Sequence, residues 1–193
     1  MDFATIFRLE ENLNLDKKTL VFLRWIAIFG QLFSVNLVYF FLDLEFPVLL
    51  CHIAIAIGLF TNIYLQFGLK ANLLKDLYSC SFLMYDIIQL SILLYLTGGI
   101  FNPFAILLIV PTIVSSTFLS MGSTIILGSS TIFLLFILTF FKMPLPGMEE
   151  YVLSFPNYYV IGILISLIIG LIFLSYFGIR FAGETKKRSD ALN

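Results

Sequence analysis

The residues best suited to binding a ligand form one short stretch, TGGIFNPF, at positions 97–104. Gly98 and Gly99 allow a sharp backbone turn and the close approach of a ligand. Asn102 followed by Pro103 predicts the start of a helix, because asparagine caps free N–H groups and proline suits the first turn. A helix start carries amide donors and the positive end of the helix dipole. The stretch therefore offers hydrogen-bond donors to an acceptor group.

Aromatic side chains surround this turn. Phe101 and Phe104 lie within the stretch, and Tyr95 precedes it. Donors beside aromatic rings at a lipid boundary suit a ligand that combines carbonyl acceptors, a planar ring and an apolar tail, and a quinone has all three. A plain tight turn between two helices uses the same GG and NP pairs. From these residues alone, the plain turn is the favoured interpretation.

Asp86 and Gln89 extend the polar character into the apolar stretch before the turn. In a helix rising ~1.5 Å per residue, Asp86 precedes the glycine pair by about 18 Å, which places it near the middle of a bilayer. An ionisable group there is costly unless it is paired or protonated, and so it is a functional candidate. Thr97 lies close to the same helix face. The favoured alternative is a polar clamp between helices, with Asn62 or Asn36 as the partner of Asp86.

These residues belong to a chain that is too apolar for a water-facing surface. The 193 residues are 60% hydrophobic and 12% charged, with a mean hydropathy of +1.03. Soluble domains carry roughly 45–50% apolar and about 25% charged residues, so most of this surface must face lipid. Crossing a bilayer core of ~30 Å takes about 20 apolar residues. Six stretches qualify: 20–42, 47–68, 78–97, 104–121, 123–141 and 158–180.

The sequence therefore predicts an all-α, polytopic membrane protein, a six-transmembrane-helix bundle over 20–180 with both termini cytoplasmic. A tight turn around Gly122 is expected between the fourth and fifth spans. Residues 1–19 are a cytoplasmic segment that suits either a helix lying on the membrane surface or a frayed terminus. Residues 181–193 are polar and helix-compatible, as expected for the start of a cytoplasmic linker helix.

The lysines and arginines set the orientation, because such residues near span ends gather on the cytoplasmic side. With six crossings and the N-terminus inside, Lys142 alone falls outside. An odd number of crossings would place the C-terminal cations opposite the N-terminal ones. The cations assigned to the cytoplasmic side are Arg8, Lys17, Lys18, Arg24, Lys70, Lys75, Arg180, Lys186, Lys187 and Arg188.

Several classes of function are disfavoured. A net charge of −1 and scattered cations argue against nucleic acid as a partner. Cys51, Cys80 and His52 lie in apolar stretches without metal-ligand spacing, so we expect neither a metal site nor a disulfide framework. The sequence shows no Ser/His/Asp or Cys/His set and no glycine-rich phosphate loop. We therefore expect that this chain alone is not an enzyme.

Three segments, in the expected order, carry a resemblance to a known family. GGIFNPF at 98–104 fits the GGxxNPF signature of the RegB/PrrB redox-responsive sensor histidine kinases. LRWIAIFGQ at 23–31 is similar to the opening of their first span, and YDIIQLSILLYLTGG at 85–99 to their third. The resemblance covers roughly residues 15–193, the transmembrane sensor half of such a kinase. With it, a quinone site replaces the plain turn as the favoured interpretation of the loop.

The resemblance implies the input domain of a two-component sensor histidine kinase that senses the redox state of ubiquinone. It also implies a bacterial cytoplasmic (inner) membrane location, a homodimer, autophosphorylation of a histidine, and a phosphorelay to a response regulator. The kinase region that would bind ATP and carry that histidine lies outside these 193 residues. The implied quinone site is Gly98, Gly99, Asn102, Pro103 and Phe104, with Asp86, Gln89, Tyr95, Thr97 and Phe101 as supporting residues.

Two other classes of function stay open. A small membrane transporter or channel would use Asp86 as its coupling group, although the sequence shows no obvious repeat between its halves. A lipid-modifying enzyme would normally need several His, Asp or Glu side chains at one interface, and His52 is the single histidine.

Overall fold

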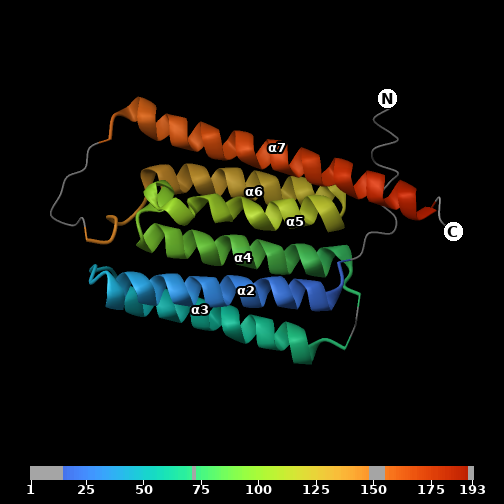
Figure 1. Ribbon diagram of the computed structural model, residues 1–193, viewed down its shortest axis with the longest axis horizontal. Helices are drawn as coiled ribbons and strands as arrows, with labels where there is room; N and C mark the ends of the chain where they lie inside the picture. Colours follow the sequence, from blue (N-terminus) through green and yellow to red (C-terminus); the bar gives the residue numbers. More distant parts are fainter. Residues whose placement is uncertain (1–14, 71–72, 148–154, 191–193) are drawn as a thin grey trace.

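The computed structural model describes residues 15–70, 73–147 and 155–190, and the regular elements in these ranges are helices. Figure 1 shows them lying side by side, from α3 and α2 through α4 to α5, α6 and α7. The π-helical turns η2 and η3 extend α2 and α3, and the 3₁₀ segments η4 and η5 precede α5. The bounds are α2 Lys17–Asn36, η2 Leu37–Phe41, α3 Val48–Ile63, η3 Tyr64–Gly68, α4 Asp76–Leu96, η4 Gly99–Phe101, η5 Pro103–Ile109, α5 Val110–Phe118, α6 Met121–Phe140 and α7 Asn157–Asp190.

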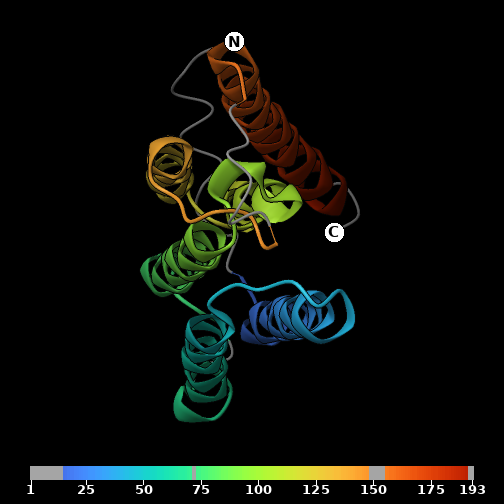
Figure 2. The ribbon, with the colours of Figure 1, turned by 90° about the vertical axis from the view of Figure 1, so that its left-hand side faces the viewer.

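Helix α4 lies in the middle of the bundle. Seen from the end, α2 and α3 lie on one side of α4, and α5, α6 and α7 lie on the other (Figure 2). Burial follows this arrangement: half of the most apolar window of α4 is buried (50%), against 6% for α7. The molecule therefore consists of an α2–α3 pair and an α5–α6–α7 group, joined through α4.

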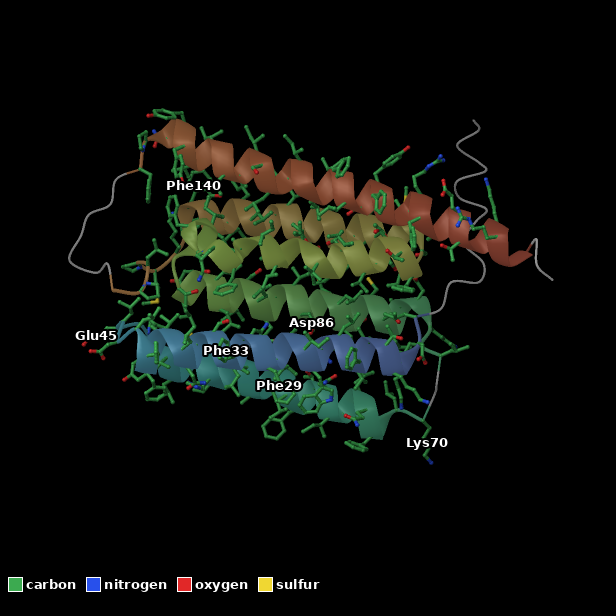
Figure 3. All side chains as sticks on the ribbon, viewed as in Figure 1. Phe29, Phe33, Glu45, Lys70, Asp86 and Phe140 are labelled. Carbon is green, nitrogen blue, oxygen red and sulfur yellow. The ribbon has the colours of Figure 1, made fainter. Side chains whose placement is uncertain are left out.

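Within the described ranges, five helical stretches are long and apolar enough to cross a membrane: Lys17–Phe41, Val48–Gly68, Asp76–Leu96, Met121–Phe140 and Asn157–Thr185. Large apolar side chains point outward along them, among them Phe29, Phe33 and Phe140, each more than half exposed (Figure 3). An exterior of this kind fits lipid rather than water. The predicted all-α fold with membrane-spanning helices is confirmed.

The helix at the fourth predicted span, 104–121, is shorter than the others. It covers Pro103–Phe118, with seven residues of 3₁₀ helix in η5 followed by nine of α-helix in α5. At rises of about 2.0 and ~1.5 Å per residue, the two parts together measure about 27 Å. Pro111 has no N–H to donate back into η5, which favours the change of helix type at this point.

The turn between α5 and α6 lies at Leu119 and Ser120, so the predicted turn around Gly122 is wrong. The Ser120 hydroxyl accepts a hydrogen bond from the Ser123 N–H and caps α6, which places Gly122 inside the helix. Asp76 at the start of α4 fixes this turn. Its carboxylate accepts hydrogen bonds from the Ser120 N–H at 2.7 Å, the Ser120 hydroxyl at 2.9 Å and the Ser123 hydroxyl.

Small side chains bring α5 close to its two neighbours. The hydroxyls of Thr112 in α5 and Thr131 in α6 lie 3.1 Å apart. On the other side, a Cβ on Gly178 of α7 would overlap the Ser116 hydroxyl of α5, so this glycine permits a very close contact. Because α7 runs without interruption to Asp190, a displacement of α5 can reach the polar end of that helix.

Some predictions concern residues outside the described ranges. Most of the 1–19 segment, including any helix on the membrane surface, lies there, as do 148–154 between the fifth and sixth predicted spans and 191–193 of the C-terminal segment. The proposed boundaries of these segments stay predictions.

Candidate ligand-binding groove

The GGIFNPF loop joins α4 to η5 through two glycines with left-handed backbones. Gly98 has a φ of 108° and Gly99 a φ of 62°, values that other residues adopt only with strain. Space is also restricted at Gly99, where an added Cβ would lie 2.5 Å from the carbonyl oxygen of Leu138 in α6. The sharp turn expected from this pair is confirmed, and the glycines are needed to form it.

The Asn102 side chain ties the two ends of the loop together. Its Oδ1 accepts a hydrogen bond from the Phe104 N–H at 2.9 Å, which confirms the predicted cap. Its Nδ2 donates to the Thr97 hydroxyl at 2.7 Å and to the Thr97 carbonyl at 3.1 Å. Both polar atoms of this amide are thus engaged within the loop.

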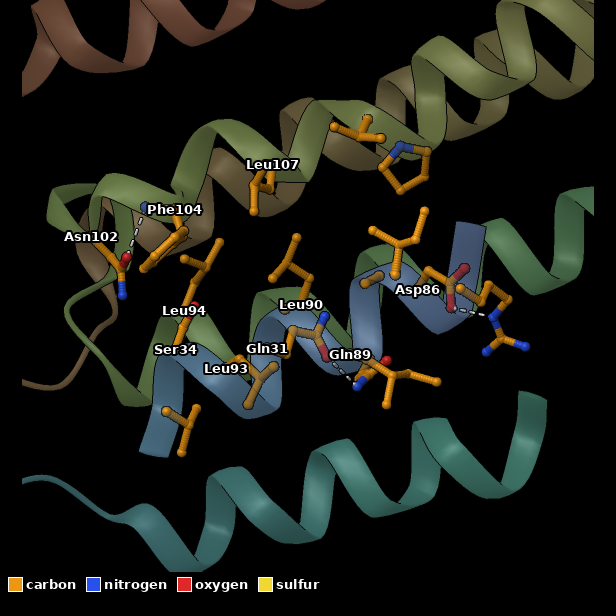
Figure 4. A pocket seen from close by; sticks show the side chains of 18 of the residues that line it. Gln31, Ser34, Asp86, Gln89, Leu90, Leu93, Leu94, Asn102, Phe104 and Leu107 are labelled. Atoms are coloured by element: carbon orange, nitrogen blue, oxygen red, sulfur yellow. Dashed lines mark hydrogen bonds and ion pairs between the residues drawn. The ribbon is translucent and has the colours of Figure 1, made fainter. Parts of the chain in front are cut away.

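A groove of about 450 Å³ lies beside the loop and is lined by residues of α2, α4, η5 and α5 (Figure 4). Leu90, Leu93 and Leu94 of α4 contribute apolar surface to it. Phe104 and Leu107, also lining residues, are each 44% exposed. The groove is therefore accessible from the surface that the apolar exterior assigns to lipid.

The groove has polar groups at both ends. Asn102 and Asp86 lie at opposite ends in Figure 4, with leucine side chains between them. At the end away from the loop, Gln31 of α2 meets Gln89 of α4, and the Gln89 Nε2 donates to the Gln31 Oε1 at 3.1 Å. An elongated ligand with one polar end fits such a lining better than a uniformly polar one.

Asp86 forms an ion pair with Arg24 of α2, in which the arginine side chain is buried and that of Asp86 is partly exposed. The Arg24 Nε donates to the Asp86 Oδ1 at 2.9 Å, and its Nη2 donates to the Thr61 hydroxyl of α3 at 2.8 Å. The guanidinium also lies over the rings of Phe82 and Tyr85, at 5.3 and 5.5 Å from their centroids. One cation thus connects α2, α3 and α4.

The clamp interpretation identified the wrong partner for Asp86. Asn62 donates instead to the Val21 carbonyl at 3.4 Å, and Asn36 donates to the Leu32 carbonyl of its own helix at 2.7 Å. Arg24 was assigned to the cytoplasmic boundary, yet it is 3% exposed inside α2. Its charge is therefore part of the helix packing and is no guide to orientation.

The opposite side of the loop faces α7. Phe101 and Pro103 line a second cavity of about 260 Å³, together with Phe155 and Tyr159. The Lys142 ammonium lies 4.7 Å from the centroid of the Phe101 ring, and partial burial lowers the pKa of that ammonium. These residues link the loop to α7 and lie away from the groove.

The structure thus separates the predicted site residues that line the groove from those that lie elsewhere around the loop. Tyr95 lines neither cavity, and its carbonyl accepts a hydrogen bond from the Met143 N–H at 2.8 Å. Arg24 and Gln31 line the groove but were not predicted as site residues. The predicted residues that line the groove are Asp86, Gln89, Thr97, Asn102 and Phe104.

The fold and the groove define a multi-pass membrane protein with a ligand-sized site between its helices. Over 176 residues the chain is 35% identical to two curated sequences, both described as the sensor histidine kinase RegB and both from Cereibacter sphaeroides. The match covers 91% of this chain but 38% of each relative, so the chain spans less than half their length. The resemblance to RegB read from the sequence is confirmed. No family model and no solved structure matches the chain.

Proposed function

We propose that this chain is the transmembrane input domain of a sensor histidine kinase and that its groove binds a quinone. The observation that carries the proposal is the groove itself, about 450 Å³ and reachable from the lipid-facing surface past Phe104 of the GGIFNPF loop. Sites for small molecules typically measure roughly 300–1,000 Å³ and are mostly apolar with few polar groups. The similarity to RegB supports the signalling context.

The position of the groove between α2 and α5 explains how ligand binding could be passed on as a signal. A ligand between α2 and α5 favours one spacing of these helices, and it shifts the bundle only if its two redox forms bind the two spacings unequally. Because α5 packs closely on α7 at Gly178, a change in spacing passes to α7 and along it to the cytoplasmic side. In the whole protein, this movement regulates autophosphorylation of an ATP-binding kinase region, within a homodimer, and phosphotransfer to a response regulator.

The same proposal includes six crossings of the bacterial cytoplasmic membrane with both ends inside. The Pro103–Phe118 helix supplies the sixth crossing, because its length of about 27 Å is close to the ~30 Å of a bilayer core. Glu45 and Lys70 then lie on opposite sides of the membrane, at the two ends of the bundle (Figure 3).

Cysteine labelling tests this orientation. Cys51 and Cys80 are buried and are first replaced by serine. We expect Glu45→Cys to react with a membrane-impermeant maleimide in intact spheroplasts and Lys70→Cys to react after permeabilisation alone, because both native side chains are exposed loop positions. Labelling of Lys70→Cys in intact spheroplasts would reverse the orientation.

Binding of decylubiquinone to the protein in lipid nanodiscs tests the ligand. We expect Phe104→Ala to raise the Kd by about three- to tenfold, the amount that one aromatic contact supplies. Phe133→Ala is the matched control, because Phe133 is 63% exposed on α6 and lines neither cavity. An unchanged Kd in Phe104→Ala would remove the loop from the site.

The structure does not favour a transporter as a second function. That interpretation depended on Asp86 as a coupling group, and Asp86 is paired with Arg24. The ion pair accounts for this carboxylate without a transported substrate.

A further inference from the structure

Gln89 is held in one position at the inner end of the groove, which is the end away from the GGIFNPF loop. It is 6% exposed, and its Nε2 donates to the Gln31 Oε1 at 3.1 Å. On the α3 side its amide lies directly against Gly58, where an added Cβ would come within 2.7 Å of Nε2 and 2.8 Å of Oε1. The amide is thus fixed between α2 and α3, and Gly58 provides the space for it.

The bond between the two glutamines leaves two of their four polar atoms without a partner among the described residues. A glutamine amide has two N–H donors and a carbonyl acceptor. The Gln31 Nε2 and the Gln89 Oε1 have no hydrogen bond to the described residues, and both side chains line the groove (Figure 4). Polar atoms left without a partner in apolar surroundings are costly, so a ligand that supplies the partners is favoured.

The loop end of the groove differs in this respect. Both polar atoms of the Asn102 amide are already bonded to Thr97 and Phe104. Gln89 and Thr97 lie about 12 Å apart along α4 at ~1.5 Å per residue, farther than the two oxygens of a single six-membered ring. A ring therefore forms its hydrogen bonds at one end of the groove.

We propose that the Gln31–Gln89 pair, rather than the Asn102 side chain, is the hydrogen-bonding end of the site. This inference rests on the proposed function, and it places the ring oxygens of the ligand at the inner end and the apolar tail toward Phe104. The Gln31 amide N–H donates to the carbonyl of an oxidised ring, and the Gln89 carbonyl accepts from the hydroxyl of a reduced ring. The two redox forms then use different atoms of one pair, which gives them the unequal binding that signalling requires.

The test compares two probes, decylubiquinone and decylbenzene, in lipid nanodiscs. Gln31→Met and Gln89→Met keep the side-chain shape and remove the amide. We expect Gln31→Met to raise the Kd of decylubiquinone by up to about tenfold, the value of one neutral hydrogen bond. Gln89→Met should raise it less, through loss of the bond that orients the Gln31 amide, and both variants should leave the Kd of decylbenzene unchanged. Asn102→Ala is expected to affect both probes by the same factor, because it disturbs the loop and not the ring oxygens.

Gly58→Ala provides a second test with both glutamines intact. The added Cβ displaces the Gln89 amide and with it the bond that orients the Gln31 amide, so the Kd of decylubiquinone should rise while that of decylbenzene stays the same. If wild type prefers decylubiquinone but the methionine variants keep that preference, the glutamine pair is not the polar end, and the proposed function stands. If wild type binds both probes equally, the quinone proposal fails and this inference fails with it.

Discussion

Replacing Asp86 with alanine is expected to destabilise the protein by about 3–5 kcal/mol. Arg24 is 3% exposed, and the substitution leaves its guanidinium buried without a counter-charge, with the Thr61 hydroxyl as its remaining hydrogen-bond partner among the described residues. The ion pair itself is worth little against a well-packed apolar pair, but a single buried charge is costly. The loss should therefore arise mainly from the orphaned arginine.

Thermal unfolding in lipid nanodiscs, followed by the fluorescence of Trp25, measures this effect. Trp25 is the single tryptophan and stacks on Phe29 next to Arg24, with ring centroids 5.4 Å apart. The double variant Arg24→Met with Asp86→Leu removes both charges and should recover most of the lost stability. Glu45→Ala, an exposed loop acid, is the control and should stay within about 0.5 kcal/mol of wild type. An Asp86→Ala variant as stable as wild type would contradict this account.

The helices and the loop could be predicted from the sequence because their signals are local. Apolar length defines a span, and the glycine pair with Asn102 and Pro103 defines the turn and the helix start that the structure contains. The error at Gly122 shows the limit of such signals. A glycine was taken to mark the turn, whereas the Ser120 cap and its bonds to Asp76 of another helix decide its position.

The Arg24–Asp86 pair could not be predicted from local signals, because it depends on how α2 and α4 are rotated against each other. A weaker clue was available in the spacing. Arg24 and Gln31 are two turns apart on one face of α2, about 10 Å, while Asp86 and Gln89 are about 4.5 Å apart on α4. The two helices run parallel, and the long arginine side chain spans the difference between these two spacings. The Arg24–Asp86 and Gln31–Gln89 pairs can therefore form at the same time.

The groove itself depends on α2, which is distant in the sequence from α4 and α5. It exists because α2 and α5 both flank α4 while the space between them is only partly filled. No pattern within one helix encodes this gap. For the same reason the sequence favoured the loop as the polar end of the site, since the free atoms of Gln31 and Gln89 become apparent only when α2 and α4 are placed together.

Gly99→Ala is expected to be the most disruptive substitution in the GGIFNPF loop. Its φ of 62° costs a residue with a side chain about 1–3 kcal/mol when the surroundings hold it in place. The added Cβ would also lie 2.5 Å from the Leu138 carbonyl oxygen, a backbone atom that can move only with the end of α6. We therefore expect lower thermal stability together with weaker binding of decylubiquinone, because the loop that carries Phe104 must shift.

Gly162→Ala is the matched control for this substitution. Gly162 lies in α7, and no atom of the described residues lies within 4 Å of an added Cβ, so alanine there should leave stability unchanged or raise it by roughly 0.5–1 kcal/mol. Both variants are compared with wild type in the same nanodiscs, by thermal unfolding and by the Kd of decylubiquinone. If Gly99→Ala retained wild-type stability, the left-handed turn and its contact with α6 would not be what holds the loop at the mouth of the groove. Loss of stability with an unchanged Kd would mean that the turn stabilises the fold without contributing to ligand binding. We expect both quantities to change, because the Asn102 side chain bonds the Phe104 N–H and so connects the turn to Phe104.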